Sequence, residues 1–152
     1  MISANPPGGQ AAQGIGRTKV GFNTKLAAVV AAKGRVVTIS LAPGQRHDLK
    51  AVAPLVPVLR GKRAVGDKGF DADSFRASLS RQCVRGCIAP RRNRRQPVSF
   101  HRGYYRQRHH VETFFCRTKR FRLISTRYDK LALTFLAFVQ FAAVLDWFTR
   151  EV

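Results

Sequence analysis

Two apolar runs rich in β-branched residues follow each other in the first third of the chain. They cover residues 24–31 (TKLAAVVA) and 35–41 (RVVTISL), with a short turn around Lys33 and Gly34 between them. β-Branched residues favour strands, and two such runs joined by a short turn are typical of a hairpin. We therefore predict a β-hairpin over residues 24–41.

A second group of short elements is predicted between the hairpin and residue 90. A strand at residues 62–66 ends at Asp67, a helix capped by Asp73 or Ser74 runs to Gln82, and another strand covers residues 84–89. Together they form a β-turn-α-β unit. Ligands in open α/β sheets gather at the carboxyl ends of strands, so Asp67 is a candidate site residue.

Two helices are predicted in the last third, over about residues 104–120 and 131–150. The second contains the only long apolar run, but polar residues such as Gln140 and Asp146 interrupt it, which favours a buried core helix over a membrane span. Aromatic residues at helical spacing are expected in the core rather than in a base-stacking surface. They are Phe135, Phe138, Phe141 and Trp147.

Residues 1–16 are rich in Pro, Gly, Gln and Ala, and they show neither a strand nor a helix period. We expect a disordered tail or linker there and one domain over residues 17–152. The first residues have no charged and apolar segments of a secretory signal, and the three cysteines are an odd number. Both features favour a reducing cytoplasm with free thiols.

Charge then narrows the class of partner. The chain has 28 Lys and Arg against 8 Asp and Glu, a net charge of +20, which predicts a polyanionic partner, most commonly a nucleic acid. The alternatives are a ribosome-like structural role or a membrane-surface protein. The hydrophobic content of 45% argues against a disordered basic tail, because such tails lack a core.

A basic loop at residues 90–103 could be a solvated charge run or a surface for phosphates, and the charge elsewhere favours phosphates. Its candidate DNA-binding residues are Arg91, Arg92, Arg94 and Arg95. Nearby, Tyr104 and Tyr105 could stack on a frayed DNA end.

Glu112 is the only acid between Ser74 and Tyr128. Tyr105, Arg108 and Lys119 share its stripe on the predicted helix, because their spacings are three, four and seven residues. Glu112 could form a surface ion pair with Arg108, worth only about 0.3–0.5 kcal/mol. With Asp67 it could instead hold a pair of Mg²⁺ ions for displacement at phosphorus.

Zinc is a weaker alternative. Cys83 and Cys87 have a permitted spacing, and His109, His110 and Cys116 follow, but no second half at finger spacing is present. We interpret the first two cysteines as small core or strand residues, and the two histidines as groups that face DNA or solvent.

The stripe Tyr105, Arg108, Glu112 and Lys119 resembles the Tyr-Arg-Glu-Lys signature of bacterial insertion-sequence transposases of the DDE type. Five further stretches look like that group, in its order. They are GRTKVGFNTKLAAV (16–29), APGQRHD (42–48), GDKGFDA (66–72), IAPRRNRRQP (88–97) and TRYDKLALTFLAF (126–138).

The resemblance implies a ribonuclease H-like mixed sheet with flanking helices, and Mg²⁺-dependent cleavage and transfer of DNA strands by a two-metal site. Asp67 would be the second acid of the catalytic triad and Glu112 the third, while Arg108 and Lys119 would contact the DNA backbone. Asp71 is expected to be a turn or cap residue. A homodimer on transposon ends and target DNA is also implied.

The resemblance is incomplete at one position. Relatives have a first catalytic Asp on a strand upstream of GRTK, but no acid precedes Asp48 in this chain. We expect the hairpin and the Asp67 strand to lack a neighbour, and the chain to be inactive alone. It would be completed by fusion to an upstream reading frame, or it would be a remnant. The alternative of another class is a non-catalytic basic nucleic-acid-binding protein.

Overall fold

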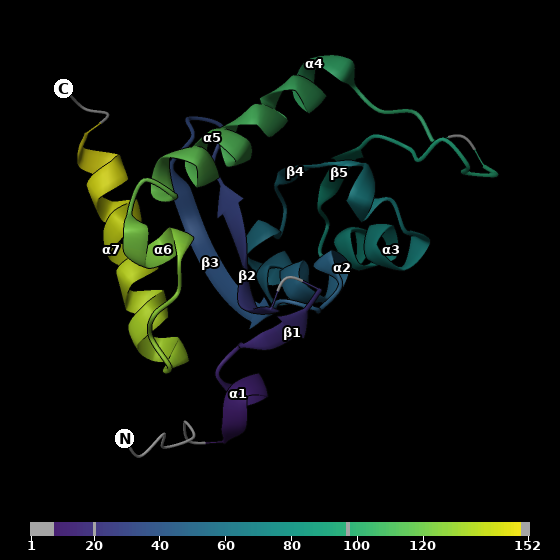
Figure 1. Cartoon of the computed structure of the whole chain (residues 1–152). Coiled ribbons are helices and arrows are strands. Elements are labelled where there is room, and N and C mark those ends of the chain that lie inside the picture. The colour runs from purple at the N-terminus through teal and green to yellow at the C-terminus, as the bar shows by residue number, and fades with distance from the viewer. Residues whose placement is uncertain (1–7, 20, 97, 150–152) are drawn as a thin grey trace, which may run out of the picture.

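The strands of the computed structural model, which describes residues 8–19, 21–96 and 98–149, form two separate sheets (Figure 1). The first is antiparallel, in the order β1 (Gly16–Thr18), β2 (Gly21–Val30) and β3 (Val36–Pro43); the second pairs β4 (Arg63–Gly66) and β5 (Arg85–Ile88) in parallel. The predicted hairpin and both short strands are confirmed, and the fold is of the mixed α/β class.

Helices, with η for the 3₁₀ type, connect and cover these strands. They are α1 (Gly9–Ala12), α2 (Asp48–Val52), η1 (Ala53–Leu59), η2 (Lys68–Phe70), α3 (Asp73–Arg81), α4 (Arg102–Tyr105), η3 (Arg106–Arg108), α5 (His109–Thr118), α6 (Arg122–Ser125) and α7 (Ala132–Phe148). The helix predicted over residues 104–120 is thus the helical run α4–η3–α5. His47 caps α2 by accepting a hydrogen bond from the amide of Leu49 at 3.3 Å.

The N-terminal segment is more ordered than its composition predicts. Residues 1–7 of the expected tail lie outside the described residues, but residues 9–16 hold α1 and the start of β1. The side chain of Gln13 accepts a hydrogen bond from the amide of Ala132 at 2.8 Å. This bond ties the segment to the first residue of α7, a contact over more than 100 residues that local composition does not encode.

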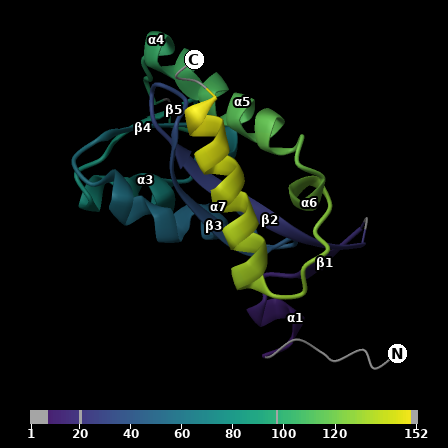
Figure 2. The same cartoon turned by 90° about the vertical axis from the view of Figure 1, so that its left-hand side faces the viewer.

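Two hydrophobic clusters accompany the two sheets. The first surrounds β4, β5 and α3, and consists of Val56, Leu79, Val84 and Ile88 with Leu59, Ala64, Phe70 and Phe75 packed on it. The second lies between the hairpin, α6 and α7, and consists of Ile124, Phe135, Val139 and Ala142 with Leu26, Ile39 and Leu41. Figure 2 shows α7 lying across the face of the β2–β3 hairpin.

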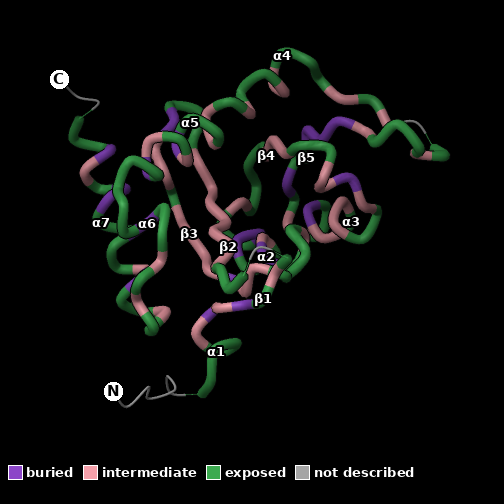
Figure 3. The backbone as a smooth tube through the Cα atoms, in the orientation of Figure 1, coloured by how far each residue is buried: buried purple, intermediate pink, exposed green. Residues whose placement is uncertain are grey.

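β2 and β4 are less covered than inner strands normally are. Strands inside α/β sheets are buried on both faces, as Cys87 and Ile88 of β5 are, but no residue of β2 or β4 is buried (Figure 3). β2 pairs with β1 only over Gly21–Asn23 and with β3 over Thr24–Val30. Within the described residues, one edge of β2 along 24–30 and one edge of β4 therefore have no strand partner.

The prediction that the four aromatic residues of α7 lie in the core is confirmed for Phe135 only. Phe135 and Val139 are 2% and 1% exposed, but Phe138, Phe141 and Trp147 are 39%, 62% and 42% exposed. α7 is apolar on all sides, and it covers the hairpin with one face only. None of the helices in the described part of the chain combines the length and apolar character needed to cross a membrane.

The cysteines divide between core and surface. Cys87 is buried on β5, as predicted, and its thiol donates to the carbonyl of His101 at 3.4 Å. Cys83 is exposed, so its prediction as a core or strand residue is wrong; it occupies a left-handed turn after α3, with φ 54°. Cys116 is exposed on α5.

Candidate active site

Asp67 directly follows β4 and caps the turn η2. Its Oδ1 accepts a hydrogen bond from the amide of Gly69 at 2.6 Å. The side chain is exposed, and its other oxygen forms no hydrogen bond or ion pair within the part of the chain that the structure describes. One carboxylate oxygen therefore orients the side chain, and the other is available to a ligand.

Glu112 lies on α5 and forms an ion pair with Arg108, one turn earlier. The Arg108 guanidinium also lies 5.8 Å from the centre of the Tyr105 ring, so three of the four residues of the stripe are in contact. Lys119 ends α5 two turns further on and is exposed. The Glu112 side chain is 54% exposed, so a second ligand can reach it.

The helical run that carries Glu112 connects the two sheets. α4 contacts β4 and β5, η3 contacts β4, and α5 contacts β2, and Figure 1 shows the run crossing from the parallel pair to the hairpin. No hydrogen bond or ion pair joins Asp67 to Glu112. Among the described residues, no three His, Cys, Asp or Glu side chains come together as a metal-ligand group.

The tyrosine rings beside this site already have partners within the chain. The guanidinium of Arg63 lies 3.7 Å from the centre of the Tyr104 ring, and the Tyr105 ring packs edge-on against Phe100 at 5.3 Å. Stacking of either ring on a DNA base would require these contacts to open.

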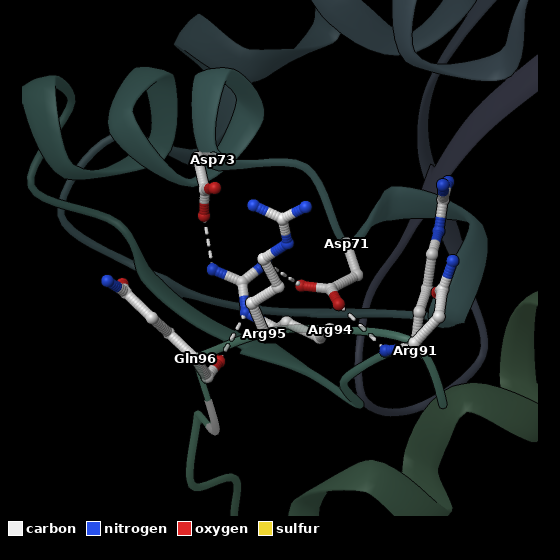
Figure 4. Close-up of a pocket in the computed structure, with 7 residues that line it drawn as sticks. Asp71, Asp73, Arg91, Arg94, Arg95 and Gln96 are labelled. Carbon is white, nitrogen blue, oxygen red and sulfur yellow. Dashed lines mark hydrogen bonds and ion pairs between the residues drawn. The ribbon is translucent and has the colours of Figure 1, made fainter.

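Two arginines of the basic loop bind other parts of the chain: Arg94, which is half-buried, and Arg91, which is exposed. Arg94 pairs with Asp71 and Asp73, and Arg91 donates to backbone carbonyls at residues 68 and 69. Arg92 and Arg95 are exposed. With Asn93 and Gln96, the loop lines an open polar cavity of about 450 Å³ in which Figure 4 shows Arg94 between the two aspartates.

Asp71 is the C-cap residue of η2, which confirms its predicted role in a turn or cap, and its buried side chain also forms ion pairs. It accepts hydrogen bonds from Arg76 Nε at 2.9 Å, from Arg94 Nη1 at 2.9 Å and from the Arg91 amide at 2.7 Å. Burial raises the pKa of the Asp71 carboxyl, but these hydrogen bonds and the two guanidinium charges outweigh burial. Its pKa consequently lies below the ordinary 3.8.

α3 begins without the predicted cap. Its N-cap residue is Ala72, and Asp73 lies in the first turn and pairs with Arg94, which raises the pKa of that guanidinium. A negatively charged side chain in the first turn of a helix remains favourable, because the helix dipole has its positive end there. Asp73 therefore connects α3 to the basic loop.

Two further arginines that composition assigns to a DNA surface hold elements together. Arg117 of α5 forms two hydrogen bonds to Asp146 of α7, of which Nη2 to Oδ2 is 2.9 Å. Arg127 contacts Thr24 of β2 and the carbonyl of Asp129, and burial lowers the pKa of its guanidinium. The motif residues around 126–130 could have suggested a structural role, but their partners are far away in sequence.

These observations agree with comparisons to known proteins. A family model described as the transposase DDE domain matches residues 1–147, and the chain therefore belongs to the DDE transposases of insertion sequences. It is 31% identical over 130 residues to a Brucella ovis protein that is provisionally described as the transposase for insertion sequence element IS6501. The match covers 83% of this chain and 98% of that protein. No solved structure matches the chain.

Family membership confirms the resemblance found in the sequence. It implies DNA as a partner and, in general, the use of divalent metal ions.

Proposed function

We propose that Asp67 and Glu112 are two of the three carboxylates of an Mg²⁺-dependent centre for DNA strand cleavage and transfer, in a ribonuclease H-like domain over about residues 17–152. The observation that carries this proposal is the path of the helical run. It begins against the strand that ends at Asp67 and continues to β2, with Glu112 on its second half. Family membership supplies the reaction class.

The two carboxylates are the kind of ligand that a hard divalent ion prefers, but they are only two of the three expected. Asp67 and Glu112 are exposed and offer carboxylate oxygens, the ligands that Mg²⁺ prefers. When bound there, divalent ions would activate the attacking oxygen and stabilise the leaving oxygen at phosphorus. The Glu112 oxygen now paired with Arg108 would have to exchange that partner for the ion.

Cations around the two acids would hold the DNA backbone. Arg92 and Arg95 are exposed on the loop, and Arg108 and Lys119 lie on the same helix as Glu112. Each phosphate contact releases counterions, so binding by these residues should weaken steeply with salt. Tyr105 would support this surface by packing against Arg108.

We further propose that this polypeptide is inactive until a strand bearing the first aspartate is added. Asp48 is not proposed for that role, because it follows β3 as the first residue of α2, where it pairs with Lys25 at 2.7 Å. The partly exposed β2 and β4, each with one edge that has no strand partner among the described residues, could both bond to an added strand. An upstream-frame polypeptide or a fusion would provide it, and a homodimer would then act on two DNA ends.

One observation favours a second function, that of a non-catalytic nucleic-acid-binding protein or transposase remnant. The ion pair of Glu112 with Arg108 is the contact expected of an ordinary helix-surface glutamate. In that case the acids stabilise the fold, and the basic surface alone contacts DNA.

Iron-mediated cleavage separates these functions. Fe²⁺ can replace Mg²⁺, and with ascorbate and peroxide it cuts the polypeptide next to a bound ion. In the presence of DNA we expect cuts near residues 67 and 112 that Mg²⁺ suppresses. Asp67→Asn and Glu112→Gln should lose them, whereas the exposed-acid control Asp73→Asn should keep them.

DNA binding and nicking complete the test. Both site variants should bind DNA with nearly unchanged salt dependence, because neither removes a cation. The chain alone should not nick supercoiled DNA with Mg²⁺. Cuts that are absent, or equal in all variants, would reject the metal site and support the binding protein.

A further inference from the structure

We propose that Arg91 is a positioning residue for Asp67: its side chain holds the turn that carries Asp67, and the buried Asp71 holds Arg91. This inference deepens the proposed function, and its importance for catalysis rests on that function. It also separates Arg91 from its exposed neighbour Arg92, although the sequence assigns both to DNA.

The first step is the contact between the Arg91 side chain and η2. Its Nε donates to the carbonyl of Lys68 at 3.1 Å, and its Nη2 donates to the carbonyl of Gly69 at 2.8 Å. A guanidinium is a rigid fork of donors, so it can bind two successive carbonyls at once. A lysine has the same charge but lacks the planar fork.

The second step is the coupling of that turn to the carboxylate. The amide of Gly69 donates to Asp67 Oδ1 at 2.6 Å, while the carbonyl of the same residue accepts from Arg91. A Cβ atom on residue 69 would lie 2.8 Å from Asp67 Oδ1, so the carboxylate packs closely on the glycine. Movement of the turn therefore moves Asp67.

The third step is the anchor of Arg91 itself. Its amide donates to Asp71 Oδ2 at 2.7 Å, and the Asp71 side chain is 1% exposed. Arg76 fixes that carboxylate and also donates to the carbonyl of Ile88, at the end of β5. The turn at Asp67 is thus fixed to the parallel strand pair through the basic loop.

Amide hydrogen exchange of Gly69, measured by NMR, tests the inference without metal or DNA. We compare wild type with Arg91→Lys, which keeps the charge, and with the control Arg92→Ala, which removes an exposed one. Gly69 should exchange at least about tenfold faster in Arg91→Lys and stay unchanged in Arg92→Ala. The amide of Leu79 in α3 reports unfolding of the part of the molecule built on β4, β5 and α3, and its exchange should not change.

The effect of Arg91 on metal binding at Asp67 is measured in a separate experiment. Cutting by Fe²⁺ near residue 67 should require roughly tenfold more Fe²⁺ in Arg91→Lys, since partners behind a metal ligand commonly have effects of that size. DNA binding by that variant should remain as in wild type.

Unchanged Gly69 exchange in Arg91→Lys would overturn the inference, and so would equal acceleration at Gly69 and Leu79. If Gly69 responds as expected but Fe²⁺ cuts nowhere in wild type, the holding contact is supported and the metal role of Asp67 in the proposed function fails.

Discussion

Asp71 shows how a charge can be buried in this very basic chain. Three donors from two parts of the sequence, α3 and the basic loop, surround its carboxylate, so it remains ionised although its side chain is almost inaccessible. A buried charge of this kind is costly to leave unpaired, and each arginine that binds it loses freedom to move. The aspartate therefore determines which loop arginines remain available to phosphates.

Replacing Asp71 with asparagine should lower the free energy of unfolding by about 2 kcal/mol at pH 7, because the charge-assisted bonds to Arg76 and Arg94 are lost. The Asp73→Asn control, at an exposed carboxylate, should change it by less than about 0.5 kcal/mol. Urea denaturation followed by circular dichroism measures both values.

The effect of pH on this difference has a definite sign. The folded pKa of Asp71 is lowered, so its contribution is present in full above the unfolded value near 3.8 and is lost as the pH falls from there through the folded value. The gap between wild type and Asp71→Asn should therefore close in acid. A gap that does not narrow as the pH falls below 3.8 would contradict the ionised carboxylate.

Sequence reasoning reached Asp67 and Glu112 as candidates but not Asp71, and the reason is physical. A residue at a strand end or on a helix stripe is placed by local periodicity, whereas the partners of Asp71 lie up to 23 residues away in a loop that has no period. The composition gives the number of arginines, but it does not show which of them bind other residues of the same chain.

At the scale of elements, α7 shows what the hydrophobic pattern can and cannot predict. Its residues are apolar on nearly every side, so the sequence identified the helix and its length but could not say which face is covered. Only the face toward β3, with Val139 and Phe135, is buried. The other face keeps Phe141 in contact with solvent.

This asymmetry predicts unequal effects along one helix. Val139→Ala should lower the unfolding free energy by about 2 kcal/mol, because it leaves a cavity between α7 and the hairpin. Phe141→Ala, at a 62% exposed position, should change it by less than about 0.5 kcal/mol. Thermal or urea unfolding of the two variants measures both changes in the free energy of unfolding. Equal losses would show that both faces of α7 are covered.

At the scale of the whole molecule, the order of strands and helices was predictable from local patterns, but the division of the described strands into two sheets is a long-range arrangement. β2 and β4 are not bonded to each other, and the two hydrophobic clusters share no residue. The connection between them depends on η1 and on the helical run that carries Glu112. Local patterns cannot express this, because each strand looks the same with or without its partner.

Separate clusters predict separate opening of the two halves. Leu79→Ala removes a buried side chain from the cluster around β4, β5 and α3, so amides of β5 should exchange faster, by a factor of about ten or more, while those of the β2–β3 hairpin change little. Hydrogen exchange with mass spectrometry resolves the two regions. Equal acceleration in both sheets would mean that the chain unfolds as one cooperative unit, and the contacts of the helical run would then have to transmit the loss across the molecule.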